Sequence, residues 1–234
     1  MTAPTFAPLV SALVLATGMG LAHAGTVQLT VNDKDGKPVP DVVVLLEQAV
    51  KTVPRPAAKP VIITQEGSRF VPFLTVVPVG STLRFTNKDG YDHHVRSTPS
   101  GPLSSIPPVK SFELRLDADP ASSSSNDTYA NTPPHKGSGT STADVKVDQP
   151  GAIGLGCHIH GSMRGQIYVA DTPWSAKTDA NGIATLEGVP DGAAQVTLWH
   201  PDQLQDQAPV PVQVSATPVK TSTQLNFVPR RRRG

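Results

Sequence analysis

Residues 151–170 read GAIGLGCHIHGSMRGQIYVA and form the most informative stretch of the chain. The apolar run at 152–155 and the β-branched run at 166–170 both have the length and composition of a strand. Cys157, His158, His160 and Met163 fall between these runs, on one short connection. A loop anchored by a strand at both ends can direct several side chains into one small volume. We therefore predict two strands here, with a candidate functional site on the loop between them.

Strand-like runs continue on both sides of this stretch. At 27–31, at 210–214 and at 225–227, apolar residues alternate with polar ones, which is the period of a half-buried strand. Further runs of strand composition cover 42–46, 61–64, 70–77, 82–86, 112–116, 145–147, 183–186 and 196–200. No long segment shows helical periodicity. The sequence therefore predicts an all-β fold built from sandwiches or barrels.

Composition and charge exclude several classes of protein. The chain has 234 residues, of which 38% are hydrophobic, and this is enough for one or two cores. Its 20 Lys and Arg against 19 Asp and Glu leave a net charge of +1, whereas a general nucleic-acid binder needs a strongly basic face. The single cysteine, Cys157, rules out an intramolecular disulfide framework.

The domain organisation is predicted from changes in composition along the chain. Residues 1–24 hold an apolar run and end in Ala22-His23-Ala24, which fits a secretory signal peptide cleaved after Ala24. Residues 121–144 are rich in Ser, Thr, Pro and Gly and are expected to form a flexible insertion. The strand-like runs fall into a hairpin at 25–50, a middle domain at 60–171 and a C-terminal sandwich at 174–229, followed by a basic tail at 230–234. The hairpin either completes the C-terminal sandwich or belongs to the middle domain.

The loop carries donor atoms that suit a transition metal. The Cys157 thiolate and the Met163 thioether are soft ligands for Cu(I), and imidazole accepts copper in either oxidation state. Two histidines and one cysteine in a trigonal site with a weak axial methionine are the blue-copper arrangement. Zinc is the competing metal, but it gains little from a thioether, so Met163 favours copper. Without a metal, Cys157 and Met163 would be packed core residues.

Two motifs together resemble the cupredoxin family. The order Cys157-x-x-His160-x-x-Met163, followed by a β-branched strand, is similar to the ligand loop of amicyanin. Residues 85–95, which contain the pair His93-His94, resemble the first-histidine region of plastocyanin and amicyanin. The resemblance implies a Greek-key cupredoxin sandwich with one mononuclear type 1 copper ion on His93, Cys157, His160 and Met163. His94 stays open as an alternative to His93.

The chain as a whole is similar to periplasmic proteins labelled methylamine-utilisation proteins, in which a cupredoxin domain accompanies a carboxypeptidase-regulatory-like β-sandwich. This resemblance implies single-electron transfer in the periplasm by a monomer that docks transiently with protein redox partners. No nucleic-acid partner and no stable membrane insertion are expected. The alternatives are a copper carrier and a scaffold or binding module. An oxidase or nitrite reductase needs a second copper site, and with seven histidines in the chain too few remain for one, so the protein is predicted not to be an enzyme.

Overall fold

The computed structural model describes residues 24–119 and 140–230. Residues 1–23 of the predicted signal peptide, 121–139 of the predicted insertion and 231–234 of the basic tail lie outside the described residues. The regular elements of the described part are strands, apart from one 3-10 turn at Pro102–Ser104, and this confirms the all-β prediction. Within it, no helix has the length and apolar character needed to cross a bilayer.

The described residues contain sixteen strands. They are β1 (Ala24–Asn32), β2 (Val43–Gln48), β3 (Val61–Glu66), β4 (Arg69–Val71), β5 (Leu74–Pro78), β6 (Thr82–Asn87), β7 (His93–Thr98), β8 (Glu113–Leu116), β9 (Thr142–Lys146), β10 (Gly151–Cys157), β11 (Arg164–Ala170), β12 (Trp174–Lys177), β13 (Ile183–Pro190), β14 (Gly192–Trp199), β15 (Val210–Val214) and β16 (Val219–Gln224).

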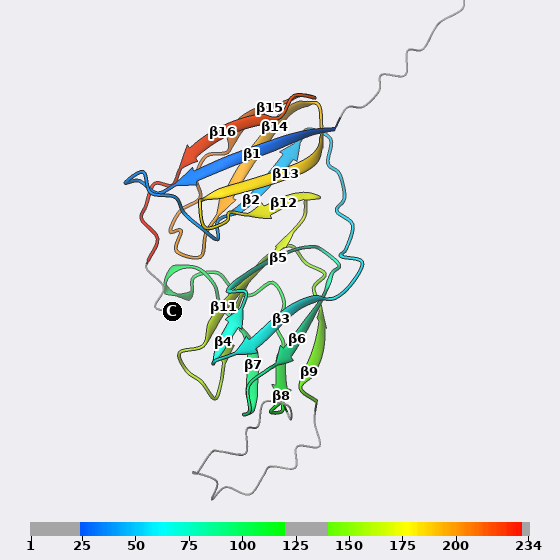
Figure 1. The fold of residues 1–234 in the computed structure, drawn as a ribbon, viewed down its shortest axis with the longest axis vertical. Coiled ribbons are helices and arrows are strands. Elements are labelled where there is room, and N and C mark those ends of the chain that lie inside the picture. The colour runs from blue at the N-terminus through cyan, green and yellow to red at the C-terminus, as the bar shows by residue number, and fades with distance from the viewer. Residues whose placement is uncertain (1–23, 120–139, 231–234) are drawn as a thin grey trace, which may run out of the picture.

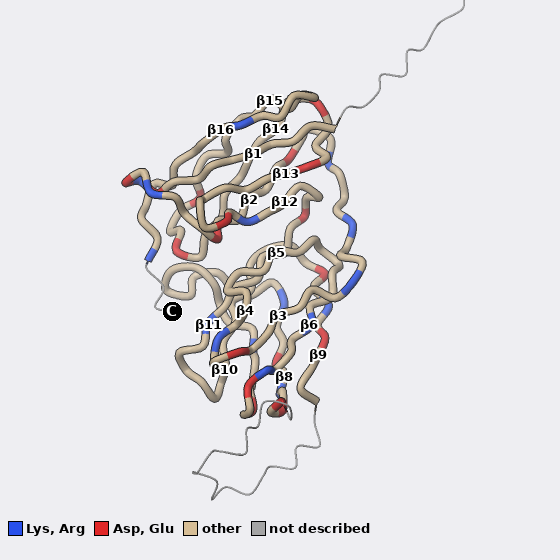
Figure 2. Tube along the Cα trace, in the orientation of Figure 1, with Lys and Arg blue, Asp and Glu red and all other residues tan. Residues whose placement is uncertain are grey.

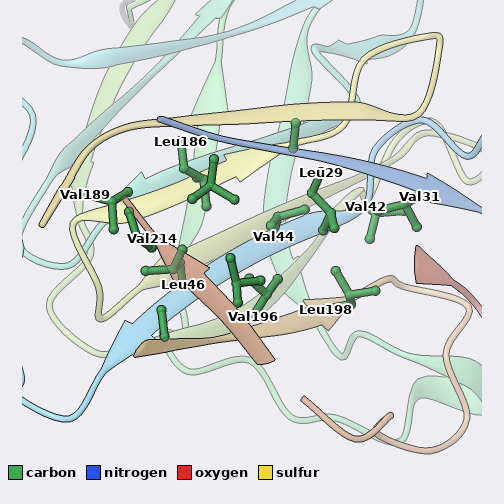
Figure 3. Packing of buried hydrophobic residues seen from close by; sticks show 14 of the residues in the cluster. Leu29, Val31, Val42, Val44, Leu46, Leu186, Val189, Val196, Leu198 and Val214 are labelled. Carbon is green, nitrogen blue, oxygen red and sulfur yellow. The ribbon is translucent and has the colours of Figure 1, made fainter. Parts of the chain in front are cut away.

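Strands from both ends of the described chain form one sandwich, which lies at the top of Figure 1 and is called the aliphatic sandwich below. One sheet has the order β13-β1-β16 and the other the order β12-β2-β14-β15. Alternate residues of β1, namely Val27, Leu29 and Val31, are fully buried, as the period-two pattern predicts. They pack against Val44 and Leu46 of β2 in a core of Val, Leu and Ala side chains (Figure 3).

Strands β3 to β11 form a second sandwich, called the donor sandwich below. Its sheets have the orders β5-β11-β10-β7-β8 and β4-β3-β6-β9. Ile63, Phe85, Leu116 and Ile153 fill its core. Because β1 and β2 pair with strands that follow residue 170, this sandwich interrupts the other one in the sequence. The two sandwiches meet through the second face of β2, where Val43 and Leu45 belong to one buried cluster with residues of β5 and β11.

The contact between the sandwiches explains why the run at 42–46 is apolar throughout. Successive side chains of a strand point to opposite faces. Val44 and Leu46 of β2 enter the aliphatic core, whereas Val43 and Leu45 pack with Leu74 of β5 and other residues of the shared cluster. Residues 43–46 of the strand are therefore buried on both faces, which leaves no position among them for a polar residue.

The structure corrects three boundaries predicted from the sequence. The run at 70–77 is divided into β4 and β5 around Pro72, whose nitrogen has no hydrogen to donate to a ladder. The alternation at 225–227 lies beyond β16, where Leu225 is buried in the aliphatic core and its N–H donates to the Asn32 carbonyl at 2.8 Å. Strand β9 begins at Thr142, within the segment assigned to the insertion, because residues 142–146 pair with β6.

Positions of Lys and Arg and positions of Asp and Glu are interspersed along the described part of the chain (Figure 2). Several of these residues form ion pairs between neighbouring segments, such as Arg84 of β6 with Asp144 of β9 at 2.8 Å. Lys177 of β12 pairs with Asp41 at 3.0 Å and also donates to the carbonyl oxygen of Leu74, which lies in the other sandwich. This mixture of signs follows from the near-neutral composition.

Candidate metal centre

Strands β7 and β10 place the candidate donor residues at one end of the donor sandwich. Strand β7 begins at His93, and β10, its antiparallel partner, ends at Cys157. The strands come this close because Gly154 has no side chain: a Cβ there would lie 2.6 Å from the carbonyl oxygen of Pro99. The chain then turns back, closed by a hydrogen bond from the Met163 N–H to the His160 carbonyl at 3.0 Å, and continues as β11.

Three donor atoms converge there, and we call them the inner donor set. Cys157 Sγ lies 3.7 Å from His93 Nδ1 and 3.6 Å from His160 Nδ1. All three atoms lie within 4.8 Å of one another. Metal bonds of about 2.0 Å to nitrogen and about 2.3 Å to sulfur, at angles between tetrahedral and trigonal, put such atoms roughly 3.5–3.7 Å apart. The two measured distances from sulfur to nitrogen therefore fit a single ion.

Burial makes the inner donor set rigid. His93 is 0% exposed and Cys157 is 2% exposed, whereas His160 is partly exposed. Met163 is buried as well and belongs to the same hydrophobic cluster as Cys157. The backbone N–H of His94 points at the cysteine sulfur, 3.4 Å away. Packing therefore constrains His93, Cys157 and Met163, whereas His160 faces partly toward solvent.

Asp89 orients the His93 ring. Its Oδ2 lies 2.8 Å from His93 Nε2, and both side chains are buried. Burial lowers the pKa of His93 below its ordinary value, against the opposing effect of the hydrogen bond to Asp89, so the ring is neutral at neutral pH. An ionised carboxylate only accepts hydrogen bonds, so Nε2 carries the proton. Nδ1, which faces Cys157, is left with its lone pair free to bind a metal.

The Asp89 carboxylate is itself held by the backbone. Oδ1 accepts a hydrogen bond from the Gly67 N–H at 2.7 Å, and Oδ2 accepts one from the Ser68 N–H at 3.1 Å. Burial alone raises the pKa of Asp89, but the hydrogen bonds from His93, Ser68 and Gly67 outweigh it and hold the pKa below its usual range. The carboxylate therefore stays charged and ties the turn between β3 and β4 to the donor histidine.

Sequence reasoning missed Asp89, since the segment Lys88-Asp89-Gly90 has the composition of an ordinary turn. The only signal in the sequence for a contact between Asp89 and His93 was their spacing of four residues. That spacing brings side chains together on a helix, whereas this segment is a turn that leads into a strand. Only the folded connection between β6 and β7 brings the carboxylate and the imidazole together.

The remaining histidines of the described residues lie outside the inner donor set. His94 points to the opposite face of the sheet, where its Nε2 lies 3.0 Å from Glu113 Oε1. His158 is exposed, and its ring packs beside that of His94. His200 is buried in the aliphatic sandwich, where its Nδ1 accepts a hydrogen bond from the Asp202 N–H. Of the two upstream histidines, the structure thus turns His93 and not His94 toward Cys157.

No protein-family model matches the chain, and no curated protein sequence matches it. Among solved structures, the copper-containing nitrite reductase of Thermus scotoductus SA-01 is similar at 20% identity and a TM-score of 0.35, over 48% of this chain and 22% of the reductase. A purple cupredoxin from Nitrosopumilus maritimus is similar at 17% identity and a TM-score of 0.33, over 47% of this chain and 99% of that one. An amicyanin variant in its Cu(I) form is similar at 14% identity and a TM-score of 0.32, over 49% of this chain and 85% of that one.

Proposed function

We propose that the protein binds one copper ion on its inner donor set and transfers single electrons. The observation that carries this proposal is the approach of the buried Cys157 sulfur to two imidazole nitrogens, at 3.7 and 3.6 Å. A buried cysteine sulfur beside two imidazole nitrogens is a set of soft and borderline donors, which favours copper over hard cations. The ligands are then His93, Cys157 and His160, with Met163 as a weak fourth ligand.

Met163 favours copper over zinc within this proposal. Zinc binds thiolate and imidazole readily but gains little from a thioether, whereas Cu(I) accepts all three. Met163 is 2% exposed and follows His160 in the same tight turn. The other methionines of the sequence, Met1 and Met19, both fall in the predicted signal peptide. A copper carrier or storage protein usually has more methionines, so electron transfer fits the sequence better.

The side chains of this centre prepare it for electron transfer by staying in place. A bound copper ion supplies the change between two valences. The protein supplies two donors that are fixed by burial and a histidine that Asp89 holds in one tautomer. Because packing sets the donor positions, little of the protein has to rearrange when the charge of the site changes.

His160 is the proposed route for electrons between the centre and the surface. It is the partly exposed member of the inner donor set. Beside it, Ile159 is 56% exposed and Tyr91 is 43% exposed, and the Tyr91 ring lies 5.1 Å from the His160 ring. Small apolar surfaces of this kind suit brief docking by a redox partner. With the predicted signal peptide, we place this exchange in the periplasm.

Copper loading of the full chain tests the proposal. We expect the Cu(II) protein to absorb strongly in the visible range by charge transfer from the Cys157 sulfur, and to lose and regain this band on reduction and reoxidation. Cys157→Ser and His93→Ala should abolish the band, whereas His94→Ala, the matched control on the opposite face, should keep it. A protein that binds only zinc, or a band that survives His93→Ala, would overturn the assignment. Copper bound without reversible reduction would indicate a carrier.

A further inference from the structure

The outer face of the same two strands carries a second group of donor atoms, which we call the outer donor set. Successive residues of a strand point to opposite faces, so His93 and His94 separate, with His93 facing inward and His94 facing outward. At the end of β10, Cys157 is buried and the next residue, His158, is exposed. His94 and His158 are held together by a backbone hydrogen bond from the His158 N–H to the His94 carbonyl at 2.9 Å.

Glu113 of the neighbouring strand β8 completes this group. Strand β8 pairs with β7 in antiparallel register, with Arg96 opposite Glu113 and His94 opposite Arg115. Glu113 is therefore the diagonal neighbour of His94 on the same face, and its Oε1 lies 3.0 Å from His94 Nε2. The centroids of the His94 and His158 rings are 5.5 Å apart. One donor atom from each of the three residues lies within 4.8 Å of the other two.

We propose that His94, His158 and Glu113 bind a second, solvent-facing divalent transition-metal ion. Two imidazoles and one carboxylate are borderline donors that suit Zn²⁺ and Cu²⁺, and they form a three-ligand site with an open position for water. Donors bonded to one such ion lie roughly 3–4 Å apart. The 3.0 Å separation of His94 and Glu113 already meets this requirement. The exposed His158 offers a ring nitrogen within 4.8 Å of both of these atoms.

Charges of both signs surround the outer donor set, with Arg96 opposite Glu113 in the ladder. Glu113 supplies a negative charge at the site itself. Arg115, which stands opposite His94 in the ladder, directs its Nη2 to Asp92 Oδ2 at 3.4 Å, so its charge is partly balanced by that carboxylate. Glu113 lies on β8, at the edge of its sheet, and its side chain is 58% exposed, so a hydrated ion has access to it.

This inference changes the prediction based on the number of histidines. From the sequence we predict that His93 and His160 bind one copper ion, with His94 as an alternative to His93, and that too few histidines remain for a second site. The alternation of the strands divides them between two faces, with His93 and His160 beside Cys157 and with His94 and His158 beside Glu113. The two donor sets share no residue, so the outer one does not depend on the proposed copper centre.

Metal titration of full-length Cys157→Ser, in which the inner donor set is disabled, tests the proposal. With ZnCl₂ and CuCl₂ followed by calorimetry, we expect one ion per chain. Adding His158→Ala or Glu113→Gln should weaken the binding at least tenfold. Adding His135→Ala, a histidine outside the described residues, is the matched control and should leave the binding unchanged. Equal affinity with and without His158, or loss of binding in the His135→Ala control alone, would overturn the proposal.

Two further measurements keep the test independent of the folding of the Cys157→Ser variant. In the wild-type chain, we expect two copper ions per chain by elemental analysis, one of them lost in His158→Ala while the visible absorption band stays. If the inner centre fails to bind copper, the wild-type chain should still bind one Zn²⁺ ion that His158→Ala loses. A wild-type chain whose metal content is the same as that of His158→Ala would contradict the outer site, whatever the inner set binds.

Discussion

The two sandwiches have similar architectures but different cores. The buried cluster of the aliphatic sandwich consists of Val, Leu and Ala alone, whereas that of the donor sandwich includes Cys157 and Met163 and borders on the buried pair Asp89 and His93. A core of aliphatic side chains contributes mainly to stability, through the apolar surface that it removes from water. The core of the donor sandwich holds sulfur donor atoms in addition to burying apolar surface. The comparison indicates that both cores stabilise the chain, whereas the donor sandwich also carries the inner donor set.

Removing an aliphatic side chain from either sandwich is expected to have the largest effect on stability. Leu29 and Leu83 are both fully buried, the first in β1 and the second in β6. Each change to Ala should lower the free energy of unfolding by about 3 kcal/mol, through lost burial and the cavity left behind. Urea titration followed by tryptophan fluorescence measures this, because Trp174 and Trp199 lie on strands of the aliphatic sandwich.

Copper content, measured at urea concentrations below the unfolding transition, tests whether copper binding depends on the core of one sandwich and not on that of the other. Leu29→Ala should keep the metal bound by the wild-type protein, since Leu29 packs in the sandwich that has no inner donor set. Leu83→Ala, within the core that also contains Cys157, should weaken copper binding. Loss of copper in Leu29→Ala with the fold intact would show that the two sandwiches do not divide the roles.

A smaller effect is expected from Asp89→Asn, which keeps the shape of the side chain and removes its charge. The hydrogen bond that fixes the His93 tautomer then comes from a neutral amide, so copper affinity should fall about 10- to 100-fold. Asp144→Asn is the control, because Asp144 pairs with Arg84 on the surface of the same sandwich. Competition with a chelator of known affinity measures the change. An unaltered affinity would mean that packing alone orients His93.

Alkaline pH should weaken the contact between the sandwiches through Tyr168. Its ring lies 5.0 Å from that of Trp199, and burial, together with Asp171, Asp206 and Glu47, raises the pKa of its hydroxyl from 10.0 to about 12. Between these values the unfolded chain loses the proton and the folded chain keeps it, so stability decreases as the pH rises. After a discount for partial exposure, we expect a loss of about 1–2 kcal/mol by pH 12.

Tyr168→Phe isolates this contribution, because it keeps the ring and removes the ionisable group. Urea titrations at pH 9 and at pH 11.5 should show a smaller loss of stability in the variant than in the wild-type chain. Other groups also titrate in this range, but they affect both proteins equally. The same loss in both would mean that the Tyr168 hydroxyl ionises normally and that the interface is open to water.

The smallest effect is expected at the exposed pair of Arg84 and Asp144. Their hydrogen bonds, at 2.8 Å each, raise the pKa of Arg84 and lower that of Asp144, but water surrounds both side chains. Surface ion pairs contribute little to stability, so Arg84→Ala should leave the melting temperature unchanged within error. A clear decrease would place the sheet of β3, β4, β6 and β9 among the elements that limit the stability of the chain.

Most strands were predictable because they alternate on one buried face or are apolar throughout. Strands β7 and β12 were not predicted from composition. His93-His94 opens β7 with polar residues that would be read as a turn, and all four residues of β12 are only partly buried. At 225–227, the apolar pattern runs past the end of β16, because Leu225 is still buried in the aliphatic core and its N–H still bonds to the Asn32 carbonyl. Periodicity reports which residues are buried, not what buries them.

The sequence by itself determined the all-β class and the grouping of Cys157, His160 and Met163 on one loop, because strand periodicity and short loops are local properties. Only the tertiary structure decided that His93 and not His94 faces the cysteine, that Asp89 orients it, and that His94 and His158 meet Glu113 on the other face. The reason is physical. The face to which a strand residue points depends on register and pairing with strands far away in the chain, and adjacent residues with identical side chains contain no information about which of them points inward.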